Sequence, residues 1–246
     1  MCGLFGLAGN FKYREKKELL INLATFSTMR GEDATGYALW RNHKVAIKKK
    51  AVSAIDYGPG RVRASMVMGH TRDATCGDPK DSEQAHPFLS HCKNFVLAHN
   101  GIAYEDYESI KEEYNLDCDT PVDSEGILRF LELDNCSINQ IKLMYSKWIN
   151  SSFAISFIDV KKGKLCLFHN NRMPLHIINI ESGTVYASTA EILELSLSES
   201  QITYDPKDIV ELQPFTLYTI TDNKTSEIDL DIPQEIQEAH LAFGKG

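Results

Sequence analysis

The chain has 246 residues, of which 43% are hydrophobic and 24% are charged, and its formal net charge is −8. This length allows one large domain or two small ones, and the hydrophobic fraction argues against disorder over most of the chain. The acidic balance argues against nucleic acid as a partner, because phosphate binding normally needs a basic face. No apolar run approaches the roughly 20 residues that a membrane-spanning helix needs, so no membrane partner is expected.

The first half of the chain is predicted to combine one helix with several strands. Leu19, Leu20, Leu23 and Phe26 recur at helical spacing and predict a helix over Glu15–Met29. Short apolar runs predict the strands Cys2–Gly9, Tyr37–Trp40, Val45–Ile47, Met66–Thr71 and Phe95–His99.

Two polar stretches interrupt or end this series of strands. Arg72–Cys92 is rich in polar residues, glycine and proline, and is predicted to be a loop. Asn100-Gly101 suits a backbone with positive φ, so the strand before it is predicted to stop there.

In the second half the period of the pattern changes from helical to alternating. Helices are predicted over Tyr104–Tyr114, Ser124–Leu133, Ile138–Trp148 and Thr189–Leu197. Strands are predicted over Phe153–Val160, Leu165–Phe168, Leu175–Ile180, Val185–Ser188 and Phe215–Thr221. This order of elements fits helices that cover stacked, largely antiparallel sheets. After Ile232-Pro233 the chain is expected to form a short tail, either helical or frayed.

The six cysteines indicate the redox compartment. None forms a C-x-x-C pair, and no Cys/His cluster has zinc-finger spacing. With no evident export signal, they are expected to be reduced thiols of a cytoplasmic protein. Cys166 stands in an apolar run and is expected to be a small core residue.

Cys2 is the most informative residue, because it follows the initiator Met1 directly. Removal of Met1 would give one residue both a thiol and a free α-amine, and an N-terminal amine can act as the base for a nucleophile. The unperturbed pKa of that amine, about 7.7–8.0, lies close to working pH. By itself, however, Met-Cys-Gly is also an ordinary way to begin a strand.

Five polar clusters stand at predicted strand ends or in predicted loops, where catalytic groups are often mounted. They are Arg30–Gly36, Gly69–Gly77, Ala85–Phe88, His99–Ile102 and Asp123–Glu125. Each has a structural alternative when taken singly. Asp33 and Asp123 could cap helices, Arg72 could be a surface residue, and Asn100-Gly101 could be only a turn. The histidines could be packed side chains, because none has a second ligand at i+4: His70, His86 and His99.

Taken together with Cys2, the clusters resemble the ordered motifs of the glutaminase domain of class II glutamine amidotransferases, which are N-terminal-nucleophile hydrolases. The motifs are most similar to those of the glutaminase half of glucosamine-6-phosphate synthase: Cys-Gly, R-G-x-D, H-T-R-x-A-T, A-H-P, H-N-G and D-[ST]-E. The resemblance implies a four-layer αββα sandwich of two largely antiparallel sheets between helical layers. It places a glutaminase domain at residues 1–232 and a tail at 233–246, and it implies no metal and no cofactor.

The resemblance also implies a role for each matching residue. Cys2 would be the nucleophile, and Asn100 and Gly101 would form the oxyanion hole. Arg72 would bind the α-carboxylate of L-glutamine and Asp123 its α-ammonium, a task that suits a guanidinium fork and a carboxylate. Three further positions would shape the substrate pocket: Arg30, Thr75 and His86.

Two positions depart from the family pattern. Asp73 stands where many relatives have an aromatic residue, and Cys76 stands where the sugar-phosphate synthases have histidine. An acidic Asp73 cannot provide an aromatic lid over the substrate, so a different mode of closure or a different partner is expected.

Little sequence follows the predicted glutaminase region, and no P-loop or dinucleotide fingerprint is present. We therefore expect a glutaminase subunit that hydrolyses L-glutamine and delivers ammonia to a separate acceptor enzyme. Four apolar residues of the tail are candidates for docking that partner: Ile236, Ala239, Leu241 and Phe243.

Two other functions remain open from the sequence. The chain could be an N-terminal-nucleophile hydrolase of another amide, although an apolar acyl substrate needs neither Arg72 nor Asp123. It could also be a catalytically silent module that senses glutamine, and retention of Met1 would favour this, because a blocked amine cannot act as the base.

Overall fold

The structure is a computed structural model, and it describes residues 1–221 and 224–242. Its strands form two sheets in which neighbouring strands are antiparallel. Sheet A has the strand order β11-β9-β10-β1-β4-β2-β3, and sheet B has the order β13-β12-β8-β7-β6-β5.

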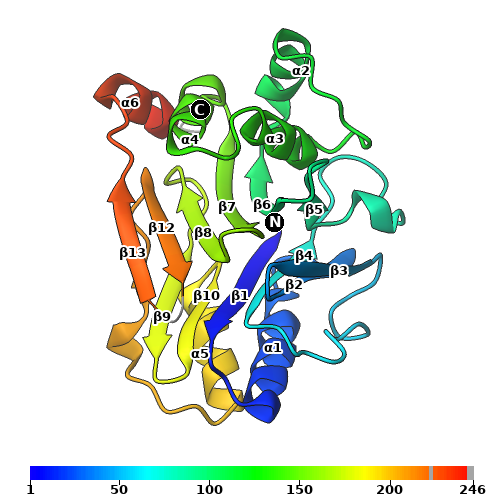
Figure 1. Cartoon of the computed structure of the whole chain (residues 1–246), viewed down its shortest axis with the longest axis vertical. Helices are drawn as coiled ribbons and strands as arrows, with labels where there is room; N and C mark the ends of the chain where they lie inside the picture. The colour runs from blue at the N-terminus through cyan, green and yellow to red at the C-terminus, as the bar shows by residue number, and fades with distance from the viewer. Residues whose placement is uncertain (222–223, 243–246) are drawn as a thin grey trace.

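The strands of sheet A are β11 (Val210–Glu211), β9 (His176–Ile180), β10 (Gly183–Ala187), β1 (Gly3–Gly9), β4 (Met66–Arg72), β2 (Ala34–Arg41) and β3 (Lys44–Lys50). Those of sheet B are β13 (Lys224–Asp229), β12 (Thr216–Thr221), β8 (Lys164–His169), β7 (Ser152–Asp159), β6 (Phe95–Ile102) and β5 (Phe88–Leu89). The helices are α1 (Tyr13–Ser27), α2 (Tyr104–Glu113), α3 (Asp123–Glu132), α4 (Ile138–Lys147), α5 (Ala190–Glu199) and α6 (Gln234–Ala242), with 3₁₀ turns at Ser82–Gln84 and Pro206–Asp208. Figure 1 shows α3, α4 and α6 at the top of the view and α1 and α5 at the bottom.

Strand β1 shows why these elements form layers. Successive side chains of a strand point to opposite faces of the sheet. Leu4 therefore packs between the two sheets, together with Met68 of β4 and Val96 of β6. Its neighbour Phe5 packs on the outer face of sheet A against Leu23 of α1.

The outer face of sheet B is covered in the same way by α2, α3 and α4. Phe130 of α3 and Trp148, directly after α4, are fully buried and meet edge to face at 4.6 Å between ring centres. Both belong to one cluster with Phe153 of β7. Burying each such side chain stabilises the fold by about 1.5–3 kcal/mol. The layer order helix, sheet, sheet, helix confirms the predicted αββα sandwich.

The predicted end of the strand at Asn100-Gly101 is wrong. Strand β6 continues to Ile102, with Asn100 opposite Ala154 and Gly101 opposite Phe153 of β7. Gly101 has φ +144°, and a Cβ on it would lie 1.9 Å from the carbonyl oxygen of Ser152. Gly101 therefore allows the backbones of β6 and β7 to approach closely, and the dipeptide does not form a turn.

Two short segments of sheet B were not predicted. Strand β5 lies inside the expected loop Arg72–Cys92, and β13 pairs with β12 along its whole length. Strand β13 is polar and largely exposed because it forms an edge of the sheet, so it lacks the apolar alternation that marks a half-buried strand.

The chain after Pro233 forms helix α6. His240 is fully buried: its Nδ1 accepts a hydrogen bond from the side-chain amide of Asn170, its Nε2 donates to the carbonyl oxygen of Tyr145, and its ring packs against Phe153. Arg172 donates to the carbonyl oxygens of Ala239 and His240. These contacts attach α6 to the α4 side of the molecule; of the expected docking residues, Phe243 lies outside the described residues.

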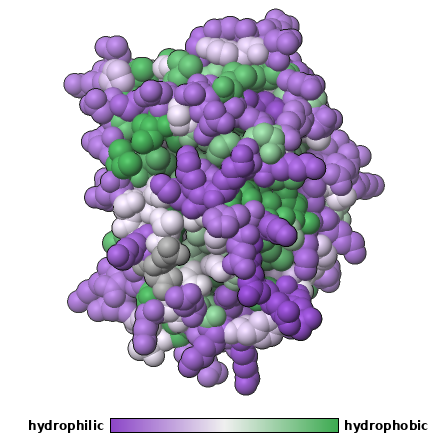
Figure 2. Space-filling model, in the orientation of Figure 1, coloured by the Kyte–Doolittle hydropathy of each residue, from purple (hydrophilic) through white to green (hydrophobic). Residues whose placement is uncertain are grey.

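Polar side chains cover most of the face drawn in Figure 2, with apolar side chains gathered in patches among them. Among the described residues, no helix has the length and apolar character that crossing a membrane requires.

Candidate functional site

The candidate site lies where strand ends from both sheets meet. Cys2 directly precedes β1, Arg72 ends β4, and Asn100 and Gly101 lie near the end of β6. Figure 1 places the N-terminus at the centre of the molecule, beside these strands. A cavity of about 20 Å³ is lined by six of the predicted site residues, Cys2, Arg72, Thr75, His86, Gly101 and Asp123. This volume accommodates about one water molecule, so an amino acid would need the cavity to widen.

The thiol of Cys2 is held by the backbone of Asp73. The Asp73 N–H donates to Cys2 Sγ at 3.4 Å, and the thiol lies 3.5 Å from the Asp73 carbonyl oxygen. Burial raises the pKa of the Cys2 thiol to about 11, although the Asp73 N–H and the N-terminal ammonium oppose this shift. The group is therefore a neutral thiol near pH 7 and needs a base before it can attack.

Arg30 holds the backbone of Cys2 rather than lining the cavity. Its Nε donates to the carbonyl oxygen of Cys2 at 2.7 Å. The ammonium group of Met1 pairs with the carboxylate of Asp73. With Met1 in place, the nitrogen of Cys2 is part of a peptide bond and carries no basic lone pair.

Arg72 and Asp123 are buried charged groups that line the cavity together, with exposed fractions of 3% and 4%. Arg72 donates to the carbonyl oxygens of Asp78 at 3.2 Å and Cys76 at 2.6 Å. Asp123 accepts from the Ala103 N–H at 2.8 Å and from the Ser124 hydroxyl at 3.2 Å. Within residues 1–221 and 224–242, neither forms an ion pair, so a positive and a negative group both face one cavity without a charged partner.

The expectation that Asp33 and Asp123 might cap helices is wrong for both. Helix α3 begins at Asp123, and the residue at its N-cap position is Val122. Asp33 instead accepts from the Ala74 N–H at 2.8 Å, and its own N–H donates to the Arg72 carbonyl oxygen at 2.9 Å. Asp33 thus fixes the loop that follows Arg72.

The side-chain amide of Asn100 offers the site a hydrogen-bond donor that is not already used. Its side chain is 1% exposed, and its Nδ2 has no hydrogen-bond partner among the described residues. A buried amide without a partner costs about 1–3 kcal/mol, and a bound ligand or a catalytic role is one explanation for such a group. Gly101, the next residue, lines the cavity.

Three buried histidines lie at the site: His86 and His99 line the cavity, and His70 packs beside His86. His86 stacks on His70 with 4.0 Å between ring centres, and His70 Nε2 lies 3.1 Å from the His99 carbonyl oxygen. Burial lowers the pKa of all three imidazoles, to about 3 for His70, so they are neutral near pH 7. Both ring nitrogens of His86 lack a partner among the described residues. Gly36 makes room for this cluster, because a Cβ there would lie 1.9 Å from the His86 carbonyl oxygen.

Thr75 and the two positions that depart from the family pattern, Asp73 and Cys76, also line the cavity. Thr75 is exposed. Cys76 Sγ lies 3.9 Å from Asp123 Oδ1, and burial raises the pKa of its thiol. Sequence reasoning missed the contact of the Asp73 N–H with the thiol. It also missed Ser124, whose hydroxyl lies 2.8 Å from His99 Nδ1, because such contacts leave no pattern in the sequence.

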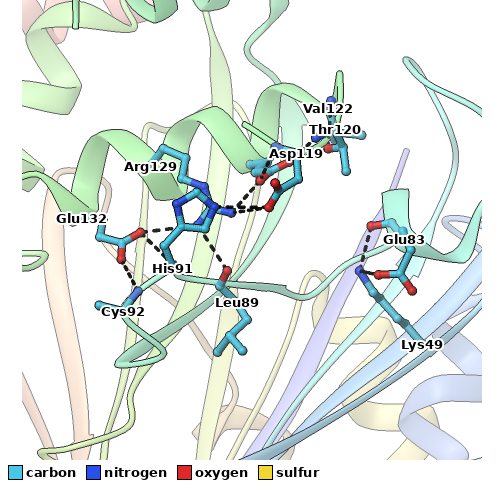
Figure 3. Close-up of polar contacts among 11 residues, drawn as sticks. Lys49, Glu83, Leu89, His91, Cys92, Asp119, Thr120, Val122, Arg129 and Glu132 are labelled. Atoms are coloured by element: carbon cyan, nitrogen blue, oxygen red, sulfur yellow. Dashed lines mark hydrogen bonds and ion pairs between the residues drawn. The ribbon is translucent and has the colours of Figure 1, made fainter. Parts of the chain in front are cut away.

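Glu125, the last residue of the D-[ST]-E motif, points away from the cavity into an ion-pair network. Its carboxylate accepts from Arg129 at 2.6 Å and from the backbone N–H groups of Asp119 and Thr120. Figure 3 shows Arg129 at the centre of this network, among Asp119, Glu132 and His91. The network fixes the loop that leads into Asp123.

His91, Asp119 and Glu125 also have ligand atoms within 4.8 Å of one another, a spacing that a metal ion could bridge. The guanidinium of Arg129 already contacts two of these three groups. A buried cation beside the ligands opposes a second cation, so we assign this cluster as an ion-pair network.

Comparison with known proteins adds an independent line of evidence. No family model matches the chain. Over 218 residues it is 29% identical to a glutamine–fructose-6-phosphate aminotransferase (isomerizing) from Bacillus thuringiensis subsp. konkukian, an alignment that covers 85% of this chain and 35% of the relative. A protein of the same name from Streptococcus agalactiae serotype V is 29% identical over 249 residues, covering 94% of this chain and 40% of the relative. The chain thus spans well under half the length of these curated relatives.

A solved structure agrees on the fold. The glutamine phosphoribosylpyrophosphate amidotransferase from B. subtilis superposes with a TM-score of 0.72 at 20% sequence identity, over 94% of this chain and 50% of that one. At this identity the likeness shows the fold, so the roles of the site residues rest on the geometry and chemistry described above.

Proposed function

We propose that this chain is a glutaminase domain of the class II glutamine amidotransferase type, which its sequence and fold resemble, and that it hydrolyses L-glutamine to L-glutamate and ammonia. The observation that carries the proposal is the pair Arg72 and Asp123, two buried opposite charges that line one cavity with the Cys2 thiol.

This pair suits the charged end of glutamine. The Arg72 guanidinium would bind the α-carboxylate through two parallel hydrogen bonds, and the Asp123 carboxylate would bind the α-ammonium. Each charge of the amino acid then meets an opposite charge, and the side-chain amide is oriented toward Cys2. A neutral amide would leave both protein charges buried without a partner, which is costly.

The chemical step would need the amine that removal of Met1 exposes. The α-amine of Cys2 would take the thiol proton while the sulfur attacks the amide carbon of glutamine. The tetrahedral intermediate would collapse when the nitrogen accepts that proton and leaves as ammonia. Water would then attack the γ-glutamyl thioester, releasing glutamate and restoring the thiol. The high pKa of the thiol makes this base essential.

The negative oxygen of the tetrahedral intermediate would be stabilised by Asn100 Nδ2 and the Gly101 N–H. The amide of Asn100 is buried and uncommitted, so little reorganisation is needed at the moment of reaction. We assign supporting roles to three further residues: Arg30 would hold the Cys2 backbone, Thr75 would line the carboxylate end, and neutral His86 would line the pocket.

The ammonia acceptor is part of the proposal. We propose a separate acceptor enzyme, served by a glutaminase domain at residues 1–232 with a tail at 233–246 that docks it. The exposed side chain of Leu241 on α6 is available for such docking. We propose that the protein acts in the reducing cytoplasm, because its six cysteines are free thiols.

A second function, a catalytically silent glutamine sensor, depends on whether Met1 is removed. While Met1 is attached to Cys2, its ammonium pairs with Asp73, which also lines the cavity. If Met1 is retained, the charged pair Arg72 and Asp123 would still bind glutamine, but no free amine would serve as the base.

The test is covalent labelling by 6-diazo-5-oxo-norleucine, a glutamine-like electrophile, of protein shown by intact mass to lack Met1. We expect one adduct, on Cys2 in the peptide map; Cys2→Ala should not label, and Cys76→Ala should label like wild type. L-glutamine should block labelling, whereas N-acetylglutamine and glutaminamide, which each lack one of the two charges, should not.

Three outcomes separate the alternatives. If N-acetylglutamine and glutaminamide blocked the labelling as well as L-glutamine does, the chain would be assigned to hydrolysis of another amide. Saturable glutamine binding without labelling of Met1-free protein would assign it to the silent sensor. An adduct on Cys76 instead of Cys2 would remove Cys2 from the nucleophile position.

A further inference from the structure

A second hollow lies at the opposite end of β1 from Cys2. Strand β1 ends at Gly9, where Ala8 pairs with Met66 at the start of β4, and Trp40 near the end of β2 pairs with the same Met66. Figure 1 shows β1 running from the central N-terminus toward the lower part of the view, beside α1. The hollow has a volume of about 530 Å³, a size typical of small-molecule sites.

Three cationic side chains line this hollow: Lys16 of α1, Arg41 at the end of β2, and Arg63 in the loop before β4. We call these three residues and the space between them the basic hollow. Its lining contains no aspartate or glutamate, although the whole chain carries a net charge of −8. A local excess of positive charge in an acidic protein attracts anions selectively to that place.

Lys16 is the buried member of the set. Its side chain is 8% exposed, and its ammonium donates one hydrogen bond, to the Ala64 carbonyl oxygen at 2.6 Å. An ammonium group has three donors, so two remain without a partner among the described residues. Burial and the charge of Arg41 lower the pKa of Lys16, and nearby Glu15 opposes this shift only in part. Glu15 accepts a hydrogen bond from Ser182 and lies outside the lining.

Arg41 and Arg63 are exposed, and neither guanidinium forms a hydrogen bond or an ion pair within the described part of the chain. Helix α1 begins at Tyr13 beside them, and its N-cap residue Lys12 provides no side-chain cap. The free N–H groups of a helix N-terminus add positive potential and favour anions. Four sources of positive charge thus converge on one hollow, and Glu15 in the first turn of α1 offsets them only in part.

From this arrangement we propose that the basic hollow binds a small phosphorylated molecule. A phosphate group has several acceptor oxygens and about two negative charges, which match two guanidinium forks and one ammonium better than a single carboxylate does. Buried Phe11 and Val62 and the half-exposed ring of Tyr13 give the remainder of the ligand an apolar surface. The site lies apart from Cys2 and does not depend on the proposed glutaminase activity.

The test titrates the full chain with inorganic phosphate by isothermal calorimetry at constant ionic strength, with chloride as the balancing ion. We expect one saturable site with a dissociation constant below about 10 mM. The double variant R41Q/R63Q should weaken binding at least about tenfold, because it removes both guanidinium forks. The matched control is R61Q, since Arg61 is an exposed arginine two positions from Arg63 that does not line the hollow.

Lys16→Met provides a second variant that keeps side-chain length and should also weaken phosphate binding. Unchanged phosphate affinity in R41Q/R63Q would overturn the proposal, as would an equal loss in R61Q or the lack of a saturable site. Citrate binding as tightly as phosphate would overturn the assignment to phosphorylated ligands.

Discussion

At the scale of single residues, the site contains groups whose interactions are incomplete. Among the described residues, Asn100 Nδ2 is buried without a hydrogen-bond partner, and Arg72 and Asp123 are buried without ion-pair partners. Each arrangement costs free energy in the folded protein, because water is lost and no equivalent bond replaces it. A ligand that supplied an anion, a cation and a developing oxyanion would complete all three at once.

Asn100→Ala should therefore reduce turnover of glutamine more than binding. We expect kcat to fall by about 10²–10³ with a much smaller change in KM, because the amide would bind the oxyanion only in the transition state. Steady-state kinetics of Met1-free protein measures this. A rise in KM with unchanged kcat would instead place Asn100 on the ground-state substrate, and an equal melting temperature would show that the fold is intact.

At the scale of elements, helix α3 begins with Asp123, and the buried ion pair between Glu125 and Arg129 holds this helix in place. Glu125 and Arg129 are 2% and 7% exposed, and their contact is 2.6 Å. The Glu125 carboxylate also accepts hydrogen bonds from the backbone N–H groups of Asp119 and Thr120, so the pair links the helix to the loop before it.

Arg129→Met should be strongly destabilising, by about 3–5 kcal/mol, because it leaves the Glu125 carboxylate buried without its cation. The double variant E125Q/R129M should recover part of this loss, since it removes both charges. Urea unfolding of the single and double variants measures the difference. Lys147→Met, which removes an exposed ion pair with Glu113, is the control and should leave stability nearly unchanged; a loss from R129M as small as this control would contradict the prediction.

At the scale of the whole molecule, five buried histidines make the fold sensitive to acid. Burial lowers the pKa of each imidazole in the folded state: His70, His86, His99, His169 and His240. In the unfolded chain their pKa returns to about 6.5. The unfolded state then binds more protons below that pH, so stability is complete above about pH 6.5 and is lost as pH falls toward the folded pKa values.

We expect the free energy of unfolding to decrease between pH 7.5 and pH 5. His70, with a folded pKa of about 3, accounts alone for about 2 kcal/mol of that decrease. Urea unfolding at the two pH values measures it. His70→Gln should reduce the difference by about 2 kcal/mol, whereas His43→Gln, at an exposed position, should not change it. Equal stability of the wild type at both pH values would contradict this account.

Much of the layer architecture follows from local sequence pattern. The helical spacing of Leu19, Leu20 and Leu23 identified α1, because those side chains must lie on one face of a helix whatever surrounds it. The apolar strands and the ordered polar clusters likewise depend on residues close together in the chain. Polar β13, which lies on a sheet edge, escaped prediction because its pairing with β12 leaves no periodic signal.

The sequence by itself therefore determined which chemical groups are present and which family their order resembles. Only the tertiary structure decided that β6 runs on through Asn100-Gly101, that Asn100 Nδ2 has no partner among the described residues, and that Arg72 meets carbonyl oxygens instead of a carboxylate. The tertiary structure also brought Lys16, Arg41 and Arg63 to one hollow. The reason is physical: burial, pairing and electrostatic surroundings are set by residues far apart in the chain, and these become neighbours only when the sheets and helices pack.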